Sequence, residues 1–114
     1  MSLLYAQGDL LIERVSDVPV SGTPLESGTD GASVLLEGET TGHRHAIYDR
    51  VTMFRDDGLA QDVPNGLYVA HLRVDEPAAR IQHDEHDAVT LPKGTYRIRR
   101  QRELEPREAR LVAD

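Results

Sequence analysis

The chain contains no cysteine and no tryptophan, and Phe54 is its only phenylalanine. Without thiols, the sequence excludes disulfide bonds, thiolate zinc sites and a cysteine nucleophile. No apolar run approaches the ~18 residues that a membrane-spanning helix needs, so no membrane span is expected. The first residues also lack the basic and apolar regions of a secretory signal peptide. These absences fit a cytoplasmic protein with an aliphatic core.

Basic residues are also scarce. The chain has 13 of them and 20 acidic residues, so its net charge is −7. The balance is uneven. Residues 93–114 carry seven basic and four acidic side chains, whereas residues 1–92 carry six and sixteen. An acidic domain repels a phosphate backbone, so nucleic acid is disfavoured unless the C-terminal segment binds it. We expect a small-molecule ligand or a protein partner, and the sequence allows a homo-oligomer.

Turn residues recur along the whole chain and separate short apolar runs. Asp57-Gly58 and Asn65-Gly66 are strong turn signals. This punctuation predicts a single all-β domain over residues 1–114, a small barrel or a β-sandwich, in which no helix exceeds about three turns. The expected strands are 9–15, 33–37, 43–48, 51–54, 67–74, 88–91 and 95–102, with 107–112 as a last strand or a single helical turn.

Two proline-containing segments and one long connection complete the expected layout. Pro77 is expected to end the strand at 67–74, and Pro92-Lys93-Gly94 has the composition of a hairpin turn. Residues 16–32 are rich in Ser, Gly, Pro and Thr and offer few apolar anchors. We expect them to form a flexible loop, because such a long structureless connection is uncommon in a compact domain unless it is mobile or acts as a lid.

His43 and His45 are the first candidate site. In a strand, residues two apart share a face and lie roughly 7 Å apart, so two imidazoles can converge on one divalent metal. Gly38 and Gly42 allow the backbone to approach such a site. The alternative is a pair of surface histidines on a strand.

A second histidine cluster follows at His83-Asp84-Glu85-His86. In a regular strand His83 and His86 point to opposite faces, so only one of them would join the first pair; in a tight turn both would. Glu85 is the candidate general base, because a carboxylate beside a metal ligand can accept a proton. The alternative is a solvated acidic turn. His71, the fifth histidine, is interpreted as a partly buried side chain with a hydrogen-bond partner rather than as a ligand.

Arg97 and Arg99 share one face of the basic run at 97–102. They are candidates for contact with an anion or an acidic partner. The alternative is an edge strand that its charges keep soluble.

The run from Gly38 to Asp49 resembles the first motif of the cupin superfamily, which has a glycine, then His-x-His, then an acidic residue. The run from His86 to Tyr96 is similar to the second motif, with its Pro-x-Gly turn. Arg97 stands where that motif has its last ligand histidine, so the resemblance implies that His83 or His86 supplies the missing ligand. The motifs GExTGHxH and HxEH also look like those of a group of small uncharacterised bacterial proteins.

The sequence therefore predicts a small cupin-like β-domain that binds one divalent metal ion through His43, His45 and His83 or His86. Imidazole and carboxylate ligands suit zinc, iron, nickel or manganese. Such a metal would polarise a small oxygen-bearing substrate or activate water if the protein is an enzyme, a point that the sequence leaves open. The alternative function is a non-enzymatic interaction module that docks a partner through the arginine-rich C-terminal strand.

Overall fold

The computed structural model describes residues 3–37 and 44–101. These residues form strands and one three-residue 3-10 helix, which confirms the all-β prediction and the absence of long helices in this part of the chain. The elements are β1 (Leu4–Gln7), β2 (Leu10–Val15), β3 (Thr23–Leu25), β4 (Ser33–Glu37), β5 (Arg44–Ile47), β6 (Thr52–Arg55), η1 (Asp57–Leu59), β7 (Tyr68–Gln82) and β8 (Val89–Arg100). No helix of the described residues is long and apolar enough to cross a membrane.

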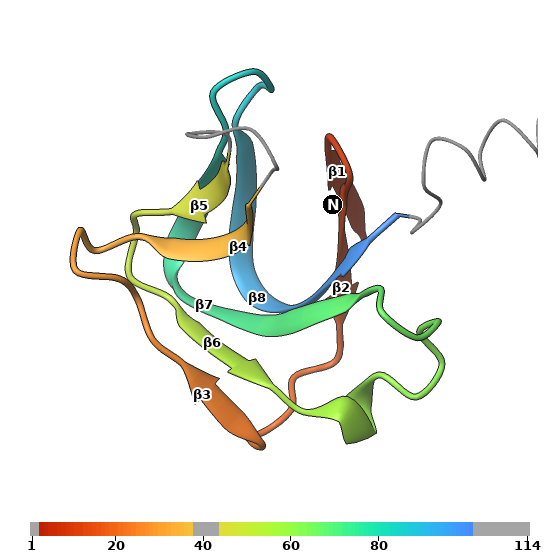
Figure 1. Ribbon diagram of the computed structural model, residues 1–114. Coiled ribbons are helices and arrows are strands. Elements are labelled where there is room, and N and C mark those ends of the chain that lie inside the picture. The colour runs from red at the N-terminus through yellow and green to blue at the C-terminus, as the bar shows by residue number, and fades with distance from the viewer. Residues whose placement is uncertain (1–2, 38–43, 102–114) are drawn as a thin grey trace, which may run out of the picture.

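All strands belong to one antiparallel sheet built around the long hairpin of β7 and β8. The main order is β1-β2-β8-β7-β5-β4, and β6 joins the N-terminal part of β7 and carries β3 on its other side. Figure 1 shows β7 and β8 bending along their length, so that the sheet curls around its core. Within the described residues β1 and β4 form the two ends of this order and do not pair, so the sheet is open.

The alternation of side chains along β7 and β8 builds the aliphatic core. Ala70, Leu72 and Val74 are fully buried on β7, and Tyr96 and Ile98 meet them from β8. Leu10, Ile12, Leu35, Ile47, Met53, Ala79, Ile81 and Leu91 complete this core. Residues two apart on a strand share a face, so this alternation turns the apolar side chains of neighbouring strands toward one core.

The two proline predictions are wrong. β7 continues through Pro77, and β8 continues through Pro92. Between the pairs Val74–Gly94 and Ala78–Pro92 the register slips, so three residues of β7 lie opposite Lys93 alone. A bulge leaves ladder positions unpaired, and a proline tolerates such a position because it has no N–H to donate.

The real hairpin turn between β7 and β8 is residues 83–88, which contain the second histidine cluster. This is the tight-turn alternative rather than the regular strand, and it decides where His83 and His86 lie.

The segment 16–32 contains more regular structure and more hydrogen bonds than its composition predicts. β3 lies within it and pairs with β6. The Ser21 hydroxyl donates to Asp56 at 2.6 Å, and the Thr95 hydroxyl donates to Asp17 at 2.8 Å. The flexibility of this segment stays a prediction. The sequence pattern also did not predict β1. The predicted strand at 107–112 lies outside the described residues.

Candidate metal centre

Three imidazole rings meet beside the tip of the β7–β8 hairpin. The ring of His45, on β5, lies 4.4 Å from the ring of His83 and 6.1 Å from that of His86, measured between centroids. The rings of His83 and His86 are 4.6 Å apart. His45 is buried, His83 is half-buried and His86 is exposed, so the cluster runs from the edge of the core to solvent. Histidines about 40 positions apart in the sequence therefore lie side by side at this turn.

The buried side chain of Gln7, at the end of β1, holds His45 in place. Its amide nitrogen donates to the carbonyl oxygens of Ile81 and Asp87, each at 2.9 Å. With both amide hydrogens used, the oxygen must face His45 Nδ1, which lies 2.8 Å away. Nδ1 of His45 then carries the proton and donates it to Gln7, and Nε2 keeps its lone pair. Metal-binding histidines in proteins commonly have this arrangement, with the second nitrogen donating to an oxygen.

The environment of His45 keeps its ring neutral. The pKa of His45 is lowered to about 4, chiefly by burial and then by the nearby charges of His83 and His86, while Asp9 opposes them. A neutral imidazole is the form that binds a metal, because a protonated ring has no lone pair to offer. His45 is therefore ready to act as a ligand at neutral pH.

The other two rings are fixed by the backbone around them. His83 Nδ1 accepts the backbone N–H of Glu85 at 3.0 Å. His86 packs against the β1–β2 turn, where a Cβ added to Gly8 would lie 2.6 Å from His86 Nε2. Gly8 also has a φ of +57°, a conformation that favours glycine. Only glycine therefore fits this position without displacing His86.

As the side chains stand, no group of three or more His, Asp or Glu residues within 3–37 and 44–101 is arranged to hold a metal ion. The contact between His83 and the Glu85 N–H offers one reason, since it occupies the lone pair of Nδ1 in His83. Ligation by His83 through either nitrogen requires this hydrogen bond to break or the ring to turn. His45 needs no such change.

The remaining residues of the predicted site have different outcomes. His43 lies outside the described residues, so its part in the site stays a prediction. Glu85 is exposed in the turn, beside His83 and His86, and its role as a base is likewise a prediction. Asp49, at the acidic position of the first cupin-like motif, accepts the backbone N–H of Arg80 at 2.7 Å.

His71 is buried and lies away from the cluster, which agrees with its interpretation from the sequence. Its ring stacks on Phe54 at 5.4 Å between centroids. The Tyr68 hydroxyl accepts the backbone N–H of Asp56 and is also hydrogen-bonded to His71 Nδ1 at 2.7 Å. Burial is the main cause that lowers the pKa of His71, and the charge of Arg97 adds to it.

Arg97 is engaged inside the domain. Its guanidinium binds Glu13 through Nε and Nη2, and Asp62 through Nη1 and Nη2. Nη1 also donates to the carbonyl of Leu59 at 3.4 Å. Arg97 therefore joins β8 to β2 and to the segment after η1. An external anion would have to displace one of these carboxylates to bind it. Arg99 is half-buried, and its contact with an outside partner stays a prediction.

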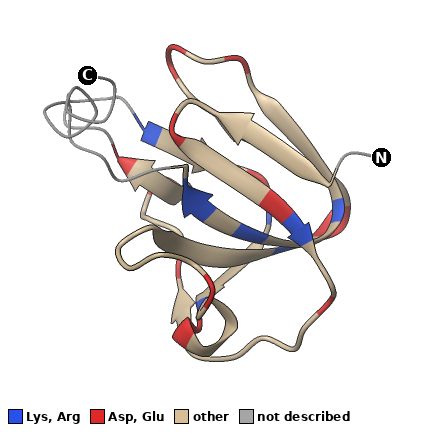
Figure 2. Ribbon diagram, turned by 90° about the vertical axis from the view of Figure 1, so that its right-hand side faces the viewer, with Lys and Arg blue, Asp and Glu red and all other residues tan. Residues whose placement is uncertain are grey.

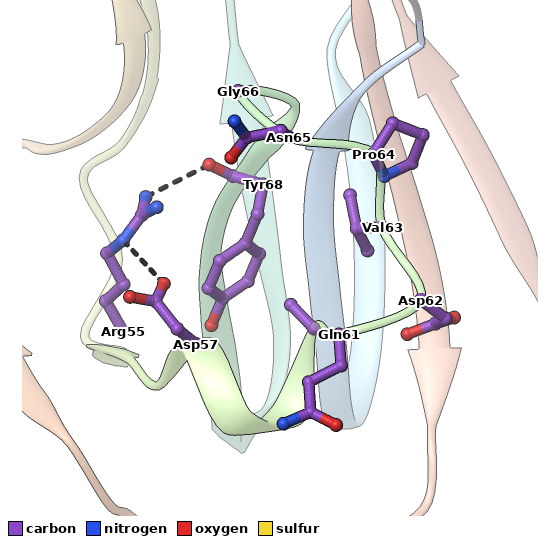
Figure 3. A pocket seen from close by; sticks show the side chains of 10 residues that line it. Arg55, Asp57, Gln61, Asp62, Val63, Pro64, Asn65, Gly66 and Tyr68 are labelled. Atoms are coloured by element: carbon purple, nitrogen blue, oxygen red, sulfur yellow. Dashed lines mark hydrogen bonds and ion pairs between the residues drawn. The ribbon is translucent and has the colours of Figure 1, made fainter.

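One surface cavity, of about 660 Å³, lies beside η1 (Figure 3). The Arg55 guanidinium covers the ring of Tyr68 at 4.7 Å, donates to the carbonyls of Tyr68 and Val69, and pairs with Asp57. These partners occupy Arg55 within the domain. A smaller cavity of about 200 Å³ borders His83 and is lined also by Arg44, Tyr48 and Asp84.

Sequence reasoning missed Gln7. A single glutamine between a short apolar run and a glycine carries no pattern, and its partners are 38 to 80 residues away. Its role becomes visible only in the folded structure, where the end of β1 lies against the tip of the β7–β8 hairpin.

Comparison with known families assigns the chain to one of them. Residues 6–101 match the family described as Domain of unknown function (DUF8820), and the chain belongs to this family. Neither a comparison with curated proteins nor one with solved structures gives a significant match. The description of the family gives no activity, so the function has to be argued from the geometry of the site.

Proposed function

We propose that this domain binds one divalent metal ion at the tip of the β7–β8 hairpin. The observation that carries the proposal is the convergence of His45, His83 and His86, together with the Gln7 amide that leaves His45 Nε2 unprotonated. Neutral imidazoles gain little from lying together, whereas a shared metal makes their convergence favourable. His45 is the first ligand, and His86 and His83 supply the next ones.

Two further parts of the proposal rest on the sequence. His43 is two residues before His45 and is included as a ligand because His-x-His in a strand puts both rings on one face. Zinc, iron, nickel and manganese all accept imidazole ligands, so the proposal covers these four metals. A cytoplasmic location and a resemblance to cupins are compatible with such a site and are carried by the sequence alone.

The chemistry of the site follows from its exposure. His45 is 5% exposed and anchors the metal at the core, whereas His86 faces solvent, so the outer side of the metal is open to water or a small ligand. A metal with an open position polarises an oxygen-bearing ligand or lowers the pKa of bound water. Glu85 in the same turn is the carboxylate that we propose as the proton acceptor.

The test is calorimetric titration of metal-free protein with zinc and with nickel, with elemental analysis of the loaded samples. We expect about one metal per chain. His45→Ala and His86→Ala should each weaken binding at least tenfold, and His43→Ala tests the ligand that lies outside the described residues. His71→Ala is the matched control, because it removes a histidine that lies beside Phe54 and Tyr68.

Binding that is equal in the His45→Ala variant and the parent would refute the proposal. So would the absence of binding by a folded, metal-free parent protein. In either case the interaction module would be the better description.

A further inference from the structure

A second cavity, of about 650 Å³, lies where the long strands bend. Arg14 of β2, Arg73 of β7 and Lys93 of β8 line it, together with Asp17 and Asp75. It forms at the bulge of β7, where three residues lie opposite Lys93. Bulges change the direction of nearby side chains and are frequent next to functional sites. The cavity is within the ~300–1,000 Å³ of small-molecule sites.

The Arg14 side chain is built into this cavity. Its Nη2 donates to the carbonyl oxygen of Lys93 at 3.0 Å, and its guanidinium carbon lies 5.7 Å from the centroid of the Tyr96 ring. A Cβ added to Gly94 would lie 2.7 Å from Arg14 Nη2, and Gly94 has a φ of +154°. A side chain at position 94 would therefore push the guanidinium out of its place.

Positive side chains outnumber negative ones in this cavity, because Arg14, Arg73 and Lys93 line it together with only Asp17 and Asp75. Figure 2 shows basic residues mainly along strands and acidic residues mainly in turns and at strand ends. In residues 3–37 and 44–101, five arginines form ion pairs with carboxylates: Arg44, Arg55, Arg73, Arg97 and Arg100.

Arg14 and Lys93 do not follow this pattern. Within the described part of the chain neither has a carboxylate partner, although Arg14 is bonded to the backbone of Lys93 itself. Both acidic residues of the cavity have other partners, because Asp75 pairs with Arg73 of the same wall and Asp17 accepts the Thr95 hydroxyl while it keeps its charge. Arg14 and Lys93 line the same cavity, and like charges repel each other, so an anion bound between them would be favourable.

We propose that this cavity binds a small molecule through a phosphate or carboxylate group, which Arg14 and Lys93 contact together. Arginine presents a planar set of donors to such a group, and lysine adds a mobile point charge. Arg73 lies at the same wall and adds a third positive side chain, already balanced by Asp75. This site uses none of the residues of the proposed metal centre.

The experiment is a titration of 15N-labelled full-length protein with sodium phosphate and with sodium succinate, at an ionic strength held constant with sodium chloride. We expect saturable shifts of the backbone amide signals of Lys93, Gly94 and Asp75. Tighter binding of phosphate would assign a phosphorylated ligand, and tighter binding of succinate would assign a carboxylate ligand.

Lys93→Gln and Arg14→Gln should each weaken binding at least tenfold. Arg80→Gln is the matched control, because Arg80 is an exposed arginine of β7 that does not line the cavity. Lys93 is itself exposed, so its replacement leaves the core intact, and Lys93→Glu should abolish binding even if the Arg14 variant fails to fold. Equal shifts with chloride alone, or unchanged affinity in the folded Lys93→Gln and Lys93→Glu variants, would overturn the proposal.

Discussion

Replacement of Gln7 by leucine should destabilise the domain by about 3 kcal/mol. Leucine has a similar volume and removes three hydrogen bonds, to His45, Ile81 and Asp87, at about 1 kcal/mol each. The three former partners stay near the core, and two of them belong to the backbone of the β7–β8 hairpin. For a domain of this size, the loss corresponds to a melting temperature lower by roughly 10–20 °C.

The same substitution should also weaken metal binding by about 10–100-fold, because His45 loses the group that fixes its proton on Nδ1. Gln7→Glu separates the two roles. A carboxylate still accepts the Nδ1 proton of His45 but has no hydrogen for the carbonyls of Ile81 and Asp87. We expect this variant to lose stability while it retains most of its metal affinity.

The assays are denaturant unfolding and zinc calorimetry, with Gln101→Ala as the matched control. Gln101 donates through its side chain to the carbonyl of Gly8, in an exposed hydrogen bond near the same turn. Its removal should change stability by less than about 0.5 kcal/mol. If Gln7→Leu falls in that range as well, the hydrogen-bond network around His45 does not stabilise the domain and the reasoning fails.

Two further predictions concern pH and Arg97. Because the pKa of His45 is about 4 when folded and near 6.5 when unfolded, the unfolded chain binds more protons between these values. Metal-free protein should therefore lose up to about 3 kcal/mol as the pH falls from 6.5 to 4, and His45→Gln should flatten this part of the profile in urea titrations. Arg97→Ala should cost about 2 kcal/mol in the same assay, because the side chain is 13% exposed and Glu13 would lose its partner. Asp62→Asn should destabilise the domain much less, since Asp62 is largely solvated. Zinc affinity should be unchanged in both variants. A large loss of zinc affinity in Arg97→Ala would contradict the separation of the Arg97 ion pairs from the proposed metal centre.

The sequence by itself determined the class of fold and much of the core. Strands such as Ser33–Glu37 and the buried series Ala70, Leu72 and Val74 follow from local alternation and from glycine turns, because both are properties of neighbouring residues. The proximity of His45 to His83 and His86 was predictable only as a chemical expectation, since a cluster of ligand-type residues suggests a common site without placing it.

The tertiary structure decided everything that depends on pairing between distant strands. A proline normally ends a strand, and only the slipped register opposite Lys93 allows β7 to pass through Pro77. That continuation moves the hairpin turn to residues 83–88 and brings both histidines of the turn to His45. Gln7 and the unpaired charges of Arg14 and Lys93 gave no local signal, because hydrogen bonds and electrostatic balance are set by which residues of remote strands become neighbours.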